Sequence, residues 1–141
     1  MQCAYTFAKL SHATRAQVGC IIVKDNRIIS IGYNGMPSGW DNNCEDITRD
    51  DRGTTTLKSK PEVLHAETNA IAKVARSGES CLNAHLFCTH MPCLDCAKII
   101  YQAGIHTVYY DVDYVARKGS GRDFLEESGI EVIQVTQQTT D

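Results

Sequence analysis

The sequence lacks a long hydrophobic run and an excess of basic residues, and we expect no secretory leader. No apolar stretch approaches the roughly 18 residues of a membrane span, so we expect no membrane partner. The N-terminal residues lack the apolar core of a signal peptide. The 14 Lys and Arg against 17 Asp and Glu give a formal net charge of −3, which argues against binding to long nucleic acid. A single nucleotide is not excluded, because its phosphate needs only one or two local donors.

Cysteine is present in an odd number, seven, in a chain without an export signal. A disulfide framework is therefore not expected, and the sequence predicts reduced thiols and a cytoplasmic location. Cys3, Cys20, Cys81 and Cys88 have apolar or helix-forming neighbours and are predicted to be small buried side chains. Cys44 lies in the polar stretch WDNNCED and is not expected in the core.

The chain shows no repeat or linker, so we predict one domain over residues 1–141, with a frayed tail at 135–141. Hydrophobic periodicity and turn residues predict helices at 2–14, 63–78, 92–104 and 121–129, and strands at 18–23, 27–33, 85–89, 106–112 and 130–135. A polar loop at 34–60 is a candidate lid or substrate wall. This order predicts an α/β three-layer sandwich: a mixed five-stranded sheet, with an N-terminal hairpin and parallel later strands, flanked by helices.

The stretch MPCLDC places Cys93 and Cys96 in the first turn of a predicted helix. Spacing of three puts both sulfurs on one helical face, and the helix N-terminus favours their thiolate forms. On this evidence alone the pair could be a disulfide, a redox couple, or half of a structural or a catalytic zinc site.

A third ligand candidate, His65, opens the preceding predicted helix in the stretch HAE. Glu67 lies two residues further, about 200° around a helix, and suits a group beside the metal rather than a ligand. One histidine and two cysteines leave the fourth position of a zinc ion to water, which is typical of a catalytic site. A thioredoxin-like couple has no need of this histidine and glutamate.

A closed structural site would need a fourth protein ligand, for which His90 and Cys44 are the candidates. His12, His85 and His106 have no paired ligand at metal spacing and are expected to be ordinary packing or surface residues.

The joint pattern H-x-E and P-C-x-x-C is the zinc-deaminase signature. Together with GYNGMPSG (32–39), HAETNAI (65–71), THMPCLDCAKII (89–100) and QAGIHTVYY (102–110), it makes the chain resemble the deoxycytidylate (dCMP) deaminases of the zinc-dependent cytidine/deoxycytidylate deaminase superfamily. The resemblance implies a cytidine deaminase-like fold, one catalytic Zn²⁺, and hydrolysis of dCMP to dUMP and ammonia, which supplies dUMP for thymidylate synthesis.

Deamination needs a hydroxide at ring carbon C4, and zinc supplies it by lowering the pKa of water from ~16 towards ~7. A carboxylate beside the metal can collect the proton of the water, protonate N3 and assist the departure of ammonia. We predict that Glu67 is this proton shuttle.

Further site residues are implied by the resemblance alone. The residues predicted to contact substrate are Asn34, Ala66, Thr89, His90, Met91 and Tyr114. For two of them a purely structural role is the alternative to substrate contact: Asn34 could form an Asn-Gly turn, and Tyr114 could be a half-buried core tyrosine. The substrate phosphate has five loop or helix-start cations as candidates: Arg49, Arg52, Arg117, Lys118 and Arg122.

The resemblance also implies a homohexamer that dCTP activates, with Mg²⁺ as its possible companion, and that dTTP inhibits. Arg76 matches a position linked to that control, although a cation at a helix C-terminus is also favourable by itself. Some relatives carry a second zinc, but this chain has no histidine between residues 41 and 64 to join Cys44, so one ion is expected.

Other functions stay open on the sequence. Within the same chemistry, the substrate could be free cytidine or deoxycytidine, or another cytosine- or adenine-containing molecule. From other classes, the candidates are a non-catalytic zinc module and a dithiol oxidoreductase.

Overall fold

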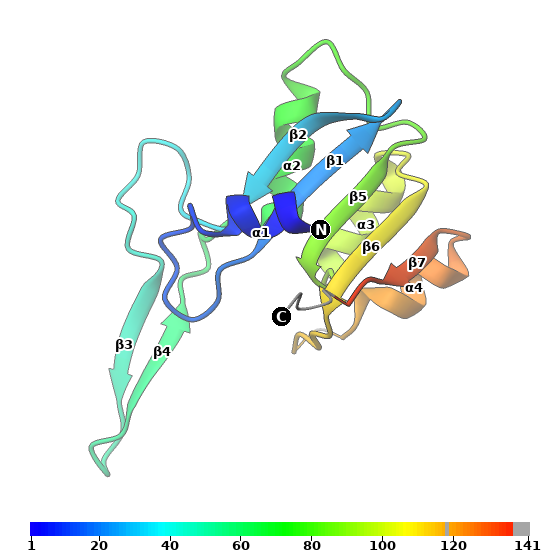
Figure 1. The fold of residues 1–141 in the computed structure, drawn as a ribbon. Helices are drawn as coiled ribbons and strands as arrows, with labels where there is room; N and C mark the ends of the chain where they lie inside the picture. The colour runs from blue at the N-terminus through cyan, green and yellow to red at the C-terminus, as the bar shows by residue number, and fades with distance from the viewer. Residues whose placement is uncertain (118, 137–141) are drawn as a thin grey trace, which may run out of the picture.

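The computed structural model describes residues 1–117 and 119–136 and is built on one five-stranded sheet in the order β2-β1-β5-β6-β7 (Figure 1). Its strands are β1 (Gly19–Lys24), β2 (Arg27–Tyr33), β5 (His85–His90), β6 (Thr107–Val112) and β7 (Glu131–Gln134). β1 pairs antiparallel with both β2 and β5, whereas β5, β6 and β7 run parallel. The predicted mixed sheet, with its N-terminal hairpin and parallel later strands, is confirmed.

Helices lie on both faces of this sheet (Figure 1). α2 (Ala66–Ala75), α3 (Leu94–Gln102) and α4 (Gly121–Glu127) cover one face, and α1 (Gln2–Ala8) crosses the other. None of the described helices has the length and apolarity that crossing a membrane requires. The main core lies between the sheet and α2–α4, where alternate strand residues meet helix residues: Cys20, Ile22, Leu86, Cys88, Val108 and Tyr110 against Ala70, Val74, Ala97, Ile100 and Leu125.

The predicted helix at 2–14 is too long, because α1 ends at Ala8. Beyond it, the side chain of Ser11 serves the backbone of an irregular segment. Its hydroxyl donates to the carbonyl oxygen of Asn34 at 2.8 Å and accepts from the amide of Ala13 at 3.1 Å. Such local side-chain bonds compete with helix formation, and here they turn the chain towards β1.

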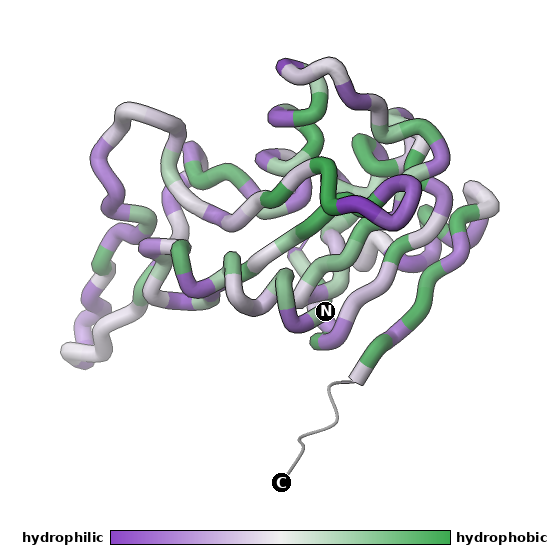
Figure 2. The backbone as a smooth tube through the Cα atoms, turned by 45° about the horizontal axis from the view of Figure 1, so that its top comes forward, coloured by the Kyte–Doolittle hydropathy of each residue, from purple (hydrophilic) through white to green (hydrophobic). Residues whose placement is uncertain are grey.

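The prediction of a structureless loop at 34–60 is also wrong, because residues 45–59 form a hairpin of β3 (Glu45–Arg49) and β4 (Thr55–Ser59). The hairpin projects from the body of the protein (Figure 1), and its tube is mostly white and purple in Figure 2, unlike the greener central strands. Asp50 Oδ1 closes its turn by accepting from the amides of Arg52 and Thr54. Polar residues on both faces hid these strands from a search for hydrophobic alternation.

Two cysteine predictions fail, and three are confirmed. Cys20, Cys81 and Cys88 are buried as predicted. Cys3 is exposed, since Ala4 and Ala8 form the inward stripe of α1. Cys44 is buried directly before β3, where its carbonyl oxygen accepts from the amide of Lys60 just after β4.

At the C-terminus, the predicted tail begins too early. The amide of Val135 donates to the carbonyl oxygen of Tyr110 at 2.7 Å and so continues the line of β7. The rest of the predicted tail, residues 137–141, lies outside the described residues.

α2 packs unusually close to β2. A Cβ atom on Gly32 would lie 2.1 Å from the carbonyl oxygen of Ala66 and 2.7 Å from the amide nitrogen of Ala70. Ser30 ties the same two elements together, since its hydroxyl donates to the carbonyl oxygen of Ala70 at 2.7 Å. The start of α2 is therefore fixed against the sheet by backbone-to-backbone contact, which only glycine allows.

We expect Gly32→Ala to lower the free energy of unfolding by about 1–3 kcal/mol, because the added methyl group must push α2 away from β2. Urea unfolding followed by circular dichroism measures this change. Gly78→Ala is the matched control, since a Cβ atom there meets nothing within 4 Å. Equal unfolding midpoints for the two variants would contradict the close packing.

Candidate active site

Two helix N-termini converge at the candidate site. His65 is the N-cap of α2, and Cys93 is the N-cap of α3, both in extended backbone conformation. Neither side chain caps its own helix, so the imidazole and the thiol are free to turn towards each other. Cys96 lies in the first turn of α3 and completes a group of three.

The three side chains meet at bonding distance for a shared ion. His65 Nδ1 lies 3.6 Å from Cys93 Sγ and 3.3 Å from Cys96 Sγ, and the three ligand atoms all lie within 4.8 Å of one another. Tetrahedral zinc, with bonds of about 2.3 Å to sulfur and 2.0–2.1 Å to nitrogen, requires sulfur and nitrogen to be roughly 3.5 Å apart. The donor set and its spacing therefore fit Zn²⁺ with one ligand position left open.

Within residues 1–117 and 119–136, this is the one cluster of three or more potential metal-ligating side chains. Neither His90 nor Cys44 belongs to it. The sequence had left both open as a fourth ligand of a closed site, and the geometry gives neither of them that place.

The two thiols differ in how readily they ionise, because their pKa values shift in opposite directions. The pKa of Cys93 is lowered to about 4, chiefly by a hydrogen bond from the Cys96 thiol and further by one with His65. The pKa of Cys96 is raised, first because it holds the proton beside Cys93 and then by burial. The hydrogen bond to Cys93 also raises the pKa of His65. A dication bound here would take the place of this shared proton, as metal binding to thiols does generally.

Glu67 lies beside the ligand group without belonging to it. It stands in the first turn of α2, is 4% exposed, and lines the same cavity as His65 and Cys93. Burial raises the pKa of its carboxyl group. A carboxyl group that is desolvated and adjacent to a metal site can hold a proton and release it during a reaction.

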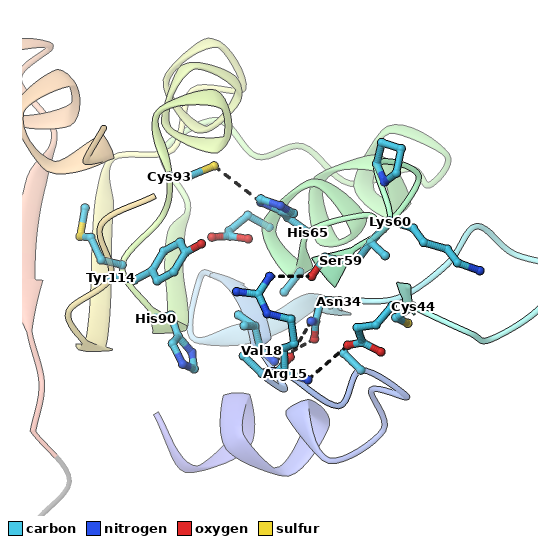
Figure 3. Close-up of a pocket in the computed structure, with 18 residues that line it drawn as sticks. Arg15, Val18, Asn34, Cys44, Ser59, Lys60, His65, His90, Cys93 and Tyr114 are labelled. Carbon is cyan, nitrogen blue, oxygen red and sulfur yellow. Dashed lines mark hydrogen bonds between the residues drawn. The ribbon is translucent and has the colours of Figure 1, made fainter. Parts of the chain in front are cut away.

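A cavity of about 340 Å³ opens next to the three ligands, a size typical of small-molecule sites (Figure 3). Most residues that the resemblance implied as substrate contacts line it: Asn34, Ala66, His90, Met91 and Tyr114. Tyr114 is 49% exposed, so it borders the cavity rather than filling the core. Burial lowers the pKa of His90, which favours its neutral imidazole.

Asn34 has a clear local role in addition. Its Oδ1 accepts from the amide of Val18 at 2.8 Å, and its Nδ2 donates to the carbonyl oxygen of Ala16 at 2.8 Å. The side chain thus joins the end of β2 to the irregular segment before β1.

Other predicted residues lie away from the cavity wall. Thr89 is fully buried, and its hydroxyl accepts from the amide of Gly19 and contacts His90 Nδ1. Arg76 is the C-cap of α2, at the opposite end from His65. Of the cations considered for the phosphate, Arg49, Arg52, Arg117 and Arg122 do not line the cavity, and Lys118 lies outside the described residues.

The sequence marks 34–60 as a candidate lid or substrate wall, but it does not identify the residues on one side of the cavity. Arg15, Glu45, Ser59 and Lys60 line it, from the segment after α1 and from the base of the β3–β4 hairpin. These residues come together only because the hairpin closes at this position, and no local sequence motif marks that position.

A sequence model of the cytidine and deoxycytidylate deaminase zinc-binding region matches residues 1–112. The chain belongs to this family. Among its relatives, the deoxycytidylate deaminase of Enterobacteria phage T4 is 32% identical over 96% of this chain and 87% of its own length. The human deoxycytidylate deaminase is 38% identical over 80% of this chain and 62% of its own.

The solved structures agree with this family assignment. The crystal structure of dCMP deaminase from the cyanophage S-TIM5, in complex with dCMP and dUMP, superposes with a TM-score of 0.81 at 42% identity, over 95% of this chain and 92% of that one. The family resemblance and the cytidine deaminase-like fold expected from the sequence are both confirmed.

Proposed function

We propose that this family member is a zinc-dependent hydrolase that converts dCMP to dUMP and ammonia and so supplies dUMP for thymidylate synthesis. The observation that carries the proposal is a three-ligand group at the wall of a cavity, with a buried glutamate next to it. The relative whose structure holds dCMP and dUMP matches this chain over nearly its whole length, which favours the nucleotide over other cytosine substrates.

When bound by His65, Cys93 and Cys96, zinc supplies the activation of water near neutral pH. Glu67 would take up the proton that this water gives away and deliver it to ring nitrogen N3. It would then take the second proton of the same water from the hydroxyl group now on C4 and transfer it to the amino group, so that the C4–N bond breaks, ammonia leaves and the carbonyl group of dUMP forms. The burial of Glu67 supports this role, because a carboxylate whose pKa is raised is a stronger base towards water and can still pass the proton on near neutral pH.

The remaining lining residues would hold the pyrimidine. The backbone of Ala66, between a ligand and the proposed shuttle, is placed to contact the base. His90, Met91 and Tyr114 would enclose the ring, and Asn34 would hold the sugar side while it braces β2. Thr89 would act only through His90, since its hydroxyl already bonds within the protein.

Regulation and assembly stay predictions from the family resemblance. They comprise activation by dCTP with Mg²⁺, inhibition by dTTP, a role for Arg76 in that response, and a hexamer. The seven unpaired thiols fit the reducing cytoplasm that the sequence predicts.

A panel of four substrates tests the proposal: dCMP, CMP, deoxycytidine and a cytosine-containing oligonucleotide. We expect kcat/KM for dCMP to exceed that for each of the other three by at least about tenfold, measured by the release of ammonia. A higher value for deoxycytidine or for the oligonucleotide would contradict dCMP as the substrate, and no release from any of the four would contradict deamination of cytosine.

A further inference from the structure

The first turn of α4 lies against the start of α3, where the two cysteine ligands are located. A Cβ atom on Gly121 would lie 2.5 Å from the carbonyl oxygen of Pro92 and 2.8 Å from that of Cys93. It would also lie 2.9 Å from the Cβ atom of Ala97. Gly121 is buried, and its φ is not in the left-handed region. Glycine is therefore needed here for space and not for backbone conformation.

We propose that Gly121 is a positioning residue for the cysteine ligands of the metal. Because it leaves room for the backbone of Pro92 and Cys93, the start of α4 can hold the two sulfur atoms where zinc needs them. This role rests on the zinc ion of the proposed function, and it concerns how the protein holds the ion rather than which substrate it takes.

Backbone pairing between the two segments is the first support. The amide of Gly121 donates to the carbonyl oxygen of Pro92 at 3.2 Å. Ser120 forms an isolated antiparallel bridge with Cys93, and its hydroxyl caps α4 by accepting from the amide of Arg122 at 3.1 Å. The two helix starts are thus joined by a short ladder, so that a displacement of one is passed to the other.

The attachment of α4 on its other side is the second support. Leu125 is fully buried in the main core, and the guanidinium of Arg122 lies over the ring of Tyr110, 5.2 Å from its centroid. Tyr110 is itself fully buried. α4 therefore cannot move away from α3 without uncovering core residues, and a side chain at position 121 would instead displace residues 92–93.

The precision that zinc requires is the third support. His65 Nδ1 lies 3.6 Å from Cys93 Sγ and 3.3 Å from Cys96 Sγ, close to the roughly 3.5 Å of a tetrahedral site. A carbon atom normally keeps about 3.3 Å from a carbonyl oxygen, so the contact at 2.5 Å demands a shift of roughly 0.8 Å. Because ligand groups must be held to about 0.5 Å, such a shift would weaken the site.

Gly19 makes the same kind of contact on the other face of the sheet. A Cβ atom there would collide with the carbonyl oxygen of Ala4 and lie 2.7 Å from the amide nitrogen of Ala8, where β1 packs against α1. The metal ligands belong to α2 and α3 on the opposite face (Figure 1). If Gly121 served packing alone, alanine at either position would have the same effect on the metal.

The test measures metal binding by Gly121→Ala, with Gly19→Ala as the matched control and Gly78→Ala, at a position with nothing within 4 Å, as the neutral one. Zinc affinity is measured by competition with a chelating dye, and the geometry of the site by the visible absorption of the protein loaded with Co²⁺. We expect Gly121→Ala to bind zinc roughly 10- to 100-fold more weakly than the wild type and to lose intensity in the cobalt bands of a tetrahedral site.

Both controls should keep the cobalt spectrum and a zinc affinity within about twofold of the wild type, although Gly19→Ala should have a lower unfolding midpoint. Wild-type zinc affinity and an unchanged cobalt spectrum in Gly121→Ala would overturn the positioning role. An equal loss of zinc affinity in Gly19→Ala would overturn it as well.

Hydrogen exchange of the wild type tests the same role without a substitution. If the start of α4 holds the ligands, zinc must in return stabilise the contact, because coupling between two sites is reciprocal. The Ser128 amide, which donates to Phe124 at the other end of α4, is the internal reference. We expect zinc to slow exchange of the Gly121 amide at least about tenfold more than that of Ser128. Equal slowing of the two amides would contradict the coupling.

None of these measurements uses turnover, so the positioning role and the proposed function can fail separately. If zinc affinity and the cobalt spectrum depend on Gly121 but no cytosine substrate is deaminated, the positioning role stands and the proposed function fails. If the zinc-loaded wild type deaminates dCMP while Gly121→Ala holds the metal as the wild type does, the proposed function stands and the positioning role fails.

Discussion

Replacing Glu67 by glutamine should lower kcat for dCMP by about 10²–10⁴-fold while each chain keeps its one zinc ion. The amide has nearly the shape of the acid but cannot carry a proton between water, N3 and the leaving amine. Because Glu67 is outside the ligand group, metal affinity should not depend on it. Because its burial disfavours the charged form, the neutral amide should leave folding intact. Stopped-flow assays and metal analysis by mass spectrometry measure the two effects.

The control for this variant is Glu131→Gln, which makes the same change at an exposed position on β7. It should retain wild-type activity. Near-full turnover in zinc-loaded Glu67→Gln would rule out the shuttle. Loss of zinc together with activity would instead make Glu67 a ligand, against the geometry described above.

Removing the zinc should abolish deamination and lower the melting temperature on the order of 10 °C. An ion that is present at a thousand times its dissociation constant stabilises a protein by about 4 kcal/mol, and each kcal/mol is worth several degrees in a chain of this size. Without the metal, the N-termini of α2 and α3 lose the dication that would join His65 to Cys93 and Cys96. Calorimetry before and after dialysis against a chelator measures the shift, and restored activity on reloading shows that the loss is specific.

Cys93→Ser should lose zinc and activity together, whereas Cys3→Ser, at an exposed position on α1, should lose neither. X-ray absorption of the loaded wild type should show two sulfur ligands and two lighter ones. Four protein ligands in an active preparation, or undiminished turnover after complete removal of the metal, would overturn the open coordination on which the proposed function depends. A closed site would favour the non-catalytic zinc module instead.

The metal site could be predicted from the sequence because its three ligands lie in two short motifs. HAE and PCLDC each lie at the start of a helix, and the chemistry of their side chains limits what the two can do together. The sheet could be predicted for a similar reason: the β-branched strands and the helix-ending glycines have clear periodicity. Even the tight turn after β1 follows from its residues, since Asp25 and Asn26 both adopt positive φ.

The segment 34–60 could be marked as a candidate substrate wall, but the residues that form the wall could not be named, because they come together from parts distant in the chain. Glu45 meets the amides of Thr14 and Arg15 only after the polar β3–β4 hairpin has closed. Its strands bury little, so no pattern distinguishes them from a loop. Cys44 shows the same limit, since its polar neighbours suggested exposure, whereas the structure buries it directly before β3.

The close packing of α2 against Gly32 and the exposure of the β3–β4 hairpin have a consequence for how this protein can evolve. The proposed proton shuttle lies in the first turn of α2, whose packing against β2 leaves no room for a side chain at Gly32, whereas exposed polar residues of the hairpin can change at little cost in stability. We therefore expect changes in substrate preference to arise more readily among the cavity-lining residues at the hairpin base than among those of α2.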